Sequence, residues 1–348
     1  MRRWVKVSVT AAVVLGLGGY FAEPYAQHWM LAGSACDGAM PRDAVERLVP
    51  EDALLMGEES RENRILGSYY CGVTYKGEET KREDGSDLVA VAAYTRRDDQ
   101  DREFTRAFDD EHRFVPVADG LPGFIDRSGS ITLLLPCPDL GKDDEGRPRK
   151  MLVRTWIGHN TNRKAPGVAY RVAVGLTNSA SKKLGCGAEP LKAPTSGAVP
   201  VDPFDDDDGP KAVPLSRAKG TACAWVADAG LPQEASDGWQ VLVASNKEAP
   251  TERCDLSAQG GKYAQREWGM SFTAWYGDWS NGLTFEGDLG GPRRETATAR
   301  CDGEAANFAL NAYGDAPGVD EAARQRMLKR FAEDQVRRHG CSGLRFTF

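Results

Sequence analysis

Alternating apolar and polar positions predict that the first half of the chain is rich in β-strands. The segment 67–75 (GSYYCGVTY) alternates with the two-residue period of a half-buried strand. Further strands are expected over 88–94, 131–136 and 151–158, where apolar runs stand between turn-rich stretches. A short helix is expected over 41–48, because a proline suits its first turn. These elements predict an antiparallel sheet that follows a short helix.

Each half of the chain is expected to end in a longer helix. In the second half, apolar residues recur at helical spacing at Val319, Ala323, Met327 and Phe331. Arg337 and Arg338 crowd the last turn, where cations suit the negative end of the helix dipole, and Gly340 suits the position just past the end. Residues 166–185 end in the same way, with two lysines before a glycine.

The cysteines reveal an internal repeat. The chain has eight, four in each half: Cys36, Cys71, Cys137, Cys186, and then Cys223, Cys254, Cys301, Cys341. GSAC ending at Cys36 matches GTAC ending at Cys223, and LGC ending at Cys186 matches HGC ending at Cys341. APGV at 165–168 recurs at 316–319. Since these landmarks keep the same order, we interpret the chain as two tandem copies of one module.

The repeat organises the whole chain. We expect a cytoplasmic tip and transmembrane anchor over 1–30, a first α+β module over 31–192 and a second over 215–348. Residues 193–214 read as a linker rich in proline and aspartate, because this composition does not bury enough apolar surface to order itself. The acidic run 205–208 lacks the ligand spacing and final glutamate of an EF-hand, so no calcium site is expected.

The predicted fold class is therefore α+β. It has two tandem copies of a module with an antiparallel sheet, a short N-terminal helix and a longer C-terminal helix, after an N-terminal transmembrane helix. Duplication also narrows the disulfide pairing, because both halves should pair alike. In each copy the third cysteine leaves a strand and the fourth follows a helix that must pack on the sheet. The predicted pairs are Cys36–Cys71, Cys137–Cys186, Cys223–Cys254 and Cys301–Cys341.

The N-terminus predicts export. Basic residues precede the uncharged run 7–22, which is close to the length a tilted helix needs to cross a bilayer. The positive flank keeps the N-terminus in the cytoplasm and places the bulk of the chain outside. A cleaved signal peptide, processed near 32–35, is an alternative that gives a secreted protein. A lipid anchor at Cys36 is another, although Gly33 stands where a lipobox has an aliphatic residue.

Composition agrees with this location. The hydrophobic fraction of 41% and charged fraction of 27% indicate a globular chain. The net charge of −7 gives no electrostatic support for a nucleic-acid partner. No two cysteines form a C-x-x-C pair, which argues against a zinc ribbon or a redox motif. An even set of well-spread cysteines instead fits structural disulfides, which persist outside the cytosol.

The sequence contains no recognisable catalytic constellation. Its four histidines, at positions 28, 112, 159 and 339, are far apart and form no H-E-x-x-H motif. G-x-S-x-G is absent, and so is a phosphate-binding glycine loop outside the apolar N-terminal run. We therefore predict no enzyme, no catalytic residue, no cofactor and no metal site.

One segment favours binding. In WGMSFTAWYGDW (268–279), a strand would turn Met270 and Phe272 toward the core and place Trp275 and Trp279 on the opposite face. Exposed, these two tryptophans would form a platform for a glycan or a protein. Covered by the C-terminal helix or by the other module, they would be core residues, and both readings remain open.

The start G-[S/T]-A-C, a short helix, a strand with a second cysteine, more sheet and a C-terminal helix resemble small exported proteins and lipoproteins of the actinobacterial cell envelope. Some of these have α+β folds similar to the PsbP type. The resemblance implies an envelope protein of unassigned activity and brings no catalytic residues. The function expected is binding of an envelope protein or wall polymer. The alternatives are an envelope hydrolase with an unrecognised site and an accessory subunit of a membrane complex.

Overall fold

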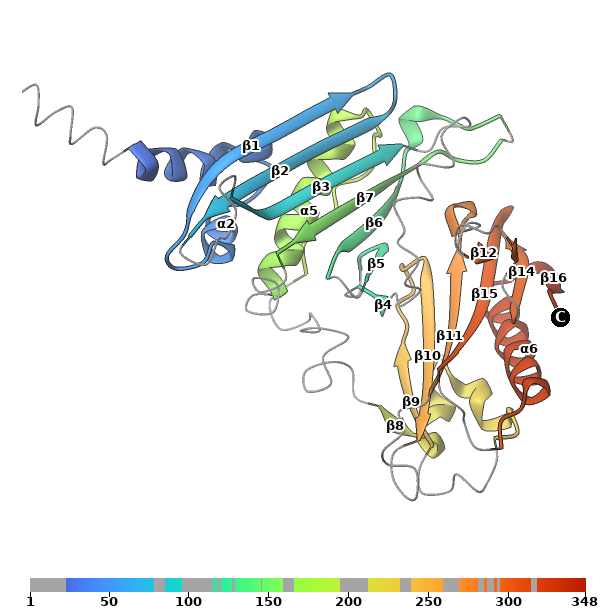
Figure 1. Cartoon of the computed structure of the whole chain (residues 1–348). Helices are drawn as coiled ribbons and strands as arrows, with labels where there is room; N and C mark the ends of the chain where they lie inside the picture. The colour runs from blue at the N-terminus through green and yellow to red at the C-terminus, as the bar shows by residue number, and fades with distance from the viewer. Residues whose placement is uncertain are drawn as a thin grey trace, which may run out of the picture.

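The computed structural model describes residues 23–77, 85–95, 115–117, 120–126, 129–144, 146–158, 166–194, 212–231, 239–258, 269–280, 285–286, 291–292, 295–313 and 318–348. Over these residues the chain forms two seven-stranded antiparallel sheets, and one long helix packs on one face of each (Figure 1). The predicted α+β class and the two sheet-containing halves are therefore confirmed.

The first sheet has the strand order β1-β2-β3-β7-β6-β5-β4. Its strands are β1 (Leu54–Asn63), β2 (Ser68–Lys76), β3 (Ser86–Thr95), β4 (Val115–Pro116), β5 (Gly123–Ile125), β6 (Ile131–Pro136) and β7 (Lys150–Ile157). The four strands predicted from the sequence correspond to β2, β3, β6 and β7. The edge strand β1 is not predicted, because most of its residues are exposed and it lacks the apolar alternation of a half-buried strand.

Helices cover one face of this sheet, which we call its inner face. They are a helical segment at 23–38, α2 (Arg42–Leu48) and α5 (Pro166–Lys183). Gly175 of α5 allows close contact with the turn before α2, since a Cβ there would lie 2.3 Å from the carbonyl oxygen of Ala39. Arg171 and Asp43 add an ion pair between α5 and α2, with Nη1 and Oδ2 2.7 Å apart.

The second sheet has the strand order β16-β14-β15-β11-β10-β9-β8. Its strands are β8 (Val213–Pro214), β9 (Trp239–Ala244), β10 (Thr251–Ala258), β11 (Gly269–Tyr276), β14 (Thr296–Cys301), β15 (Glu304–Tyr313) and β16 (Ser342–Phe346). A separate short pair joins β12 (Phe285–Glu286) to β13 (Gly291–Pro292). The last two residues of the predicted linker thus belong to this sheet, whereas the acidic run 205–208 lies outside the described residues.

A single long helix, α6 (Glu321–Arg338), packs on the inner face of the second sheet. Asp320 caps it by accepting a hydrogen bond from the Ala323 amide at 2.7 Å. Phe331 lies in the core against Trp225 and Phe272. At the entry to this module, two 3₁₀ helices, η2 (Leu215–Gly220) and η3 (Ala224–Asp228), replace the short α-helix expected there.

The two sheets share one topology, which supports the duplication. In the first module, three consecutive strands (β1, β2, β3) pair with a later hairpin in the order β1-β2-β3-β7-β6. The second module repeats this order with β9-β10-β11-β15-β14. In both, the second cysteine lies on the second strand, the third is the last residue of the hairpin's first strand or directly follows it, and the long helix follows the hairpin.

The predicted transmembrane helix requires correction. Among the helices of the described residues, none is both long and apolar enough to cross a membrane. The helical segment 23–38 is two-sided, with Trp29 and Met30 exposed and Ala32 and Ala35 buried. It packs along β1, where the Leu55 amide donates to His28 Nδ1 at 3.1 Å. The run 7–22, on which the prediction rested, lies outside the described residues, and the boundary predicted after residue 30 falls inside this helical segment.

Candidate functional site

All four predicted disulfides are present. Cys36 pairs with Cys71, Cys137 with Cys186, Cys223 with Cys254, and Cys301 with Cys341, and no cysteine is free. Glu58 approaches the first pair by accepting a hydrogen bond from the Cys36 amide at 2.9 Å. The sulfurs of Cys36 and Cys71 are bonded to each other, so this group offers no thiolate to a metal. The disulfides therefore supply neither a nucleophile nor a metal site.

The two tryptophans of the predicted ligand platform are buried at the boundary between the modules. Trp275 is 1% exposed and Trp279 is 2% exposed, so the exposed platform is wrong. The alternation on β11 is as predicted, with Met270 and Phe272 in the core of the second module. Trp275 and Trp279 instead form a separate apolar cluster with residues of the first module. Its buried members from that module are Phe124, Leu134 and Leu152.

Polar contacts surround this cluster and fix the two modules together. Asn246 donates from Nδ2 to the carbonyl oxygens of Val117 and Leu121, at 3.1 and 3.2 Å. Lys150 and Glu304 form an ion pair across the boundary, with Nζ and Oε2 2.7 Å apart. The predicted platform is thus the centre of an internal interface with an apolar core and a polar border.

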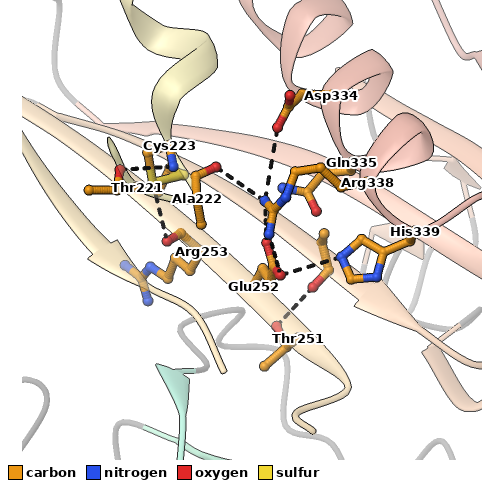
Figure 2. A network of polar contacts seen from close by, with 12 residues as sticks. Thr221, Ala222, Cys223, Thr251, Glu252, Arg253, Asp334, Gln335, Arg338 and His339 are labelled. Carbon is orange, nitrogen blue, oxygen red and sulfur yellow. Dashed lines mark hydrogen bonds and ion pairs between the residues drawn. A yellow bond between two sulfur atoms is a disulfide. The ribbon is translucent and has the colours of Figure 1, made fainter. Parts of the chain in front are cut away.

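A cluster of charged groups surrounds Glu252 on β10 (Figure 2). Glu252 is 4% exposed and points toward the C-terminal end of α6. Arg338 binds its carboxylate with two hydrogen bonds, from Nη1 to Oε2 at 2.8 Å and from Nη2 to Oε1 at 2.9 Å. His339 Nε2 lies 3.3 Å from Oε1. This bidentate geometry is the strong form of an arginine–carboxylate pair.

Neighbouring groups hold the cluster in place. The Tyr276 ring lies against the His339 ring, with centroids 4.2 Å apart, and its hydroxyl donates to Gln335 Oε1. Arg338 also donates to the Ala222 carbonyl at 3.2 Å, which ties the end of α6 to the segment before Cys223. Burial and the negative charge of Glu252 raise the pKa of Tyr276 well above its usual value, so the phenol stays protonated.

The charge balance explains how Glu252 stays ionised inside the protein. Burial alone raises the pKa of its carboxyl, but the hydrogen bond from His339 and the charge of Arg338 outweigh burial, so the pKa lies below its usual value. A carboxylate whose two oxygens are held by Arg338 and His339 is a poor general base. The cluster therefore anchors the end of α6 to the sheet.

The first module has an aromatic partner for the helix-end cation at the same place, and this cation also forms ion pairs with Asp37 and Glu62. Counting back from the last cysteine of each module, Lys183 corresponds to Arg338, and counting back from the second cysteine, Tyr69 corresponds to Glu252. Lys183 Nζ lies 5.2 Å from the centroid of the Tyr69 ring, a cation–π contact. The sequence indicated that the helix ends carry cations but gave no sign of their strand partners, because 86 residues separate Glu252 from Arg338.

The structure leaves an aromatic surface on the outer face of the first sheet. Gly72, Ala90 and Trp156 are cross-strand neighbours on β2, β3 and β7. Tyr70 and Ala92 form the next row. All except Gly72 are partly exposed, and no described helix lies on this side of the sheet (Figure 1). We call these five residues the open face. The sequence of one strand does not reveal which face of the sheet is covered.

Comparison with known proteins found no match among protein-family models, curated proteins or solved structures. The remaining histidines, at 112 and 159, lie outside the described residues.

Proposed function

We propose that this protein is a noncatalytic extracytoplasmic binding protein, and that the open face of its first module binds a component of the cell envelope. The observation that carries the proposal is the open face itself. Tyr70 and Trp156 present aromatic surface on a sheet face where the neighbouring aromatic residues, Tyr94 and Phe124, are packed against the second module. Partly exposed aromatic side chains that gather on one face favour recognition.

The disulfides support the extracytoplasmic location. All eight cysteines are paired within their own module, and such pairs persist in oxidising compartments. The interface between the modules supports a single binding unit. Trp275 and Trp279 are used to join the modules, and Tyr94 and Phe124 pack with them. Among the described aromatic residues on the outer face of the first sheet, this leaves Tyr70 and Trp156 accessible.

Two measurements test this proposal. Thiol alkylation in intact cells should label none of the eight cysteines before reduction and all of them afterwards; labelling without reduction would place the protein in a reducing compartment. Purified protein should sediment with isolated cell envelopes, and Trp156→Ala should weaken this binding at least tenfold. Trp29→Ala is the matched control, because Trp29 is 61% exposed on the segment 23–38, away from the open face. Equal binding by both variants would contradict the proposal.

A further inference from the structure

The open face has a flat floor between two aromatic side chains. A Cβ at Gly72 would lie 2.7 Å from the Tyr70 hydroxyl oxygen and 3.3 Å from Cζ, so the Tyr70 ring lies across Gly72. Ala90 pairs with Gly72 on one side and with Trp156 on the other. Two strand spacings, about 9–10 Å, therefore separate the strand positions of Gly72 and Trp156. Small side chains keep the space between the two aromatic residues shallow.

The shared fold does not require this composition. The two modules can be aligned on Cys71 of β2 and Cys254 of β10, using the strand registers. In this alignment, the residues of the second module that correspond to Tyr70, Ala90 and Trp156 are Arg253, Ser271 and Asn311. In the second module these outer positions are thus polar, although the strands pair in the same way. The aromatic and small residues of the first module therefore need a reason other than the stability of the sheet.

The charges beside the open face define the chemistry of a partner. Burial, with the negative charges of Asp87 and Glu59, raises the pKa of Tyr70. Arg61 pairs with Glu59, and Arg154 pairs with Asp126 at 2.8 Å, so both nearby cations are neutralised by carboxylates. These ion pairs carry no net charge and so provide little attraction for phosphate-rich polymers or nucleic acid, whereas carboxylate oxygens accept hydrogen bonds from hydroxyl groups. The border of the open face is therefore complementary to an uncharged, hydroxyl-rich ligand.

The open face also continues into an established interface. Ala92 and Arg154 are cross-strand neighbours, and the next outward-facing pair on the same strands is Tyr94 and Leu152, which pack against Trp275 and Trp279. A ligand that lies along the face thus ends at the second module. Because the second module limits the open face at this end, a narrow ligand fits better than one that needs a wide surface.

Resting on the proposed function, we infer that the open face binds an uncharged glycan of the cell wall, with sugar rings stacked on Tyr70 and Trp156 and hydroxyl groups hydrogen-bonded at the border. Aromatic rings offer apolar faces to the C–H groups of a sugar, and the polar border supplies specificity. The spacing of about 9–10 Å between the strand positions of Gly72, under the Tyr70 ring, and Trp156 suits a short run of sugar units better than a single one.

The test uses the full chain and two separate probes, protein-free cell-wall polysaccharide and the protein fraction of the same envelopes. Binding to the polysaccharide that falls at least tenfold in Trp156→Ala and in Tyr70→Ala, and recovers in Trp156→Phe, is the expected result. Trp29→Ala should bind as the unchanged protein does. Each variant should retain four disulfides and its unfolding midpoint, which separates loss of binding from loss of folding.

Two other outcomes separate failure of the glycan inference from failure of the proposed function. Binding only to the protein fraction, lost in Trp156→Ala, would overturn the glycan inference and leave the proposed function standing. Binding to neither probe, or binding to both that Trp156→Ala leaves unchanged, would overturn both.

Discussion

Trp279 stacks on Phe124 across the boundary between the two modules, with ring centroids 5.4 Å apart and planes inclined by 13°. Phe124 comes from β5 of the first sheet, and Trp279 follows β11 of the second. Trp279, which the sequence suggested as part of a ligand platform, thus belongs to the interface between the two modules. A stacked aromatic pair of this kind contributes about 0.5–1.5 kcal/mol beyond the area that it buries.

The interface predicts that the two modules stay associated when the chain between them is cleaved. A protease site introduced at residue 200 allows cleavage between the modules, and no disulfide links the two halves. The halves should co-elute in size-exclusion chromatography after cleavage. Trp279→Ala should weaken their association, because removal of a buried tryptophan costs about 3–5 kcal/mol. Separation of the unsubstituted halves would show that the interface is too weak to hold the modules together.

The ion pair between Lys150 and Glu304 predicts a reciprocal rescue. Lys150→Glu should destabilise the interface between the modules, because it places two negative charges together beside the apolar cluster. Adding Glu304→Lys should restore most of the loss, with a coupling energy of about 1 kcal/mol in a double-mutant cycle. Urea unfolding of the four proteins measures this coupling. Additive effects of the two substitutions would mean that the pair does not interact.

Glu252 predicts loss of stability in acid. Its pKa is lowered in the folded protein, so the ionised carboxylate contributes stability above its unfolded pKa, and this contribution is lost as the pH falls through the folded pKa. Unfolding free energies measured from neutral to acidic pH should therefore fall less steeply in Glu252→Gln than in the unchanged protein. Parallel profiles would remove Glu252 as a source of the acid sensitivity.

Arg338 should matter more than its neighbour Arg337. Arg338→Ala leaves the buried Glu252 carboxylate without its main partner, and breaking a buried pair in this way costs about 3–5 kcal/mol. Arg337 has a side chain that is 76% exposed, so Arg337→Ala should change stability by about 0.5 kcal/mol or less. Thermal unfolding of the two variants side by side provides the comparison. Equal losses would indicate a general effect of charge at the helix end.

Removal of the disulfide between Cys301 and Cys341 should lower the free energy of unfolding, because the disulfide constrains the unfolded chain. It closes a loop of 40 residues, for which the chain-entropy model gives about 3–4 kcal/mol. The double substitution Cys301→Ser with Cys341→Ser should lower the unfolding free energy by roughly this amount. Guanidinium unfolding measures the change, and a change near zero would mean that native-state strain offsets the entropy.

The sequence was informative where the signal was local or repeated. The cysteine pairs followed from duplication, because a strand end and a helix cap occur at matching places in both halves. The face of β11 that enters the core followed from its alternation, which placed Phe272 inside and Trp275 outside. Helix ends were visible from glycine and cations.

The sequence was uninformative where the answer depends on distant partners. Burial of Trp275 and Trp279 comes from β5, β6 and β7 of the other module, and alternation within one strand does not reveal what covers a face. From the sequence alone, Glu252 would be taken for an exposed strand residue, because its partners Arg338 and His339 are far away along the chain. Trp156 is the converse case, because a lone aromatic residue on a strand is usually a core residue and the structure leaves this one partly exposed.

Oxidative footprinting of aromatic side chains tests the central claim most directly, because it reports the interface and the open face in one experiment. In the free protein, Tyr70 and Trp156 should be oxidised readily while Trp275 and Trp279 stay protected. Addition of isolated cell envelopes should protect Tyr70 and Trp156 and leave the control Trp29 reactive. Oxidation of Trp275 and Trp279 in the free protein, or unchanged reactivity of Trp156 with envelopes, would contradict the account.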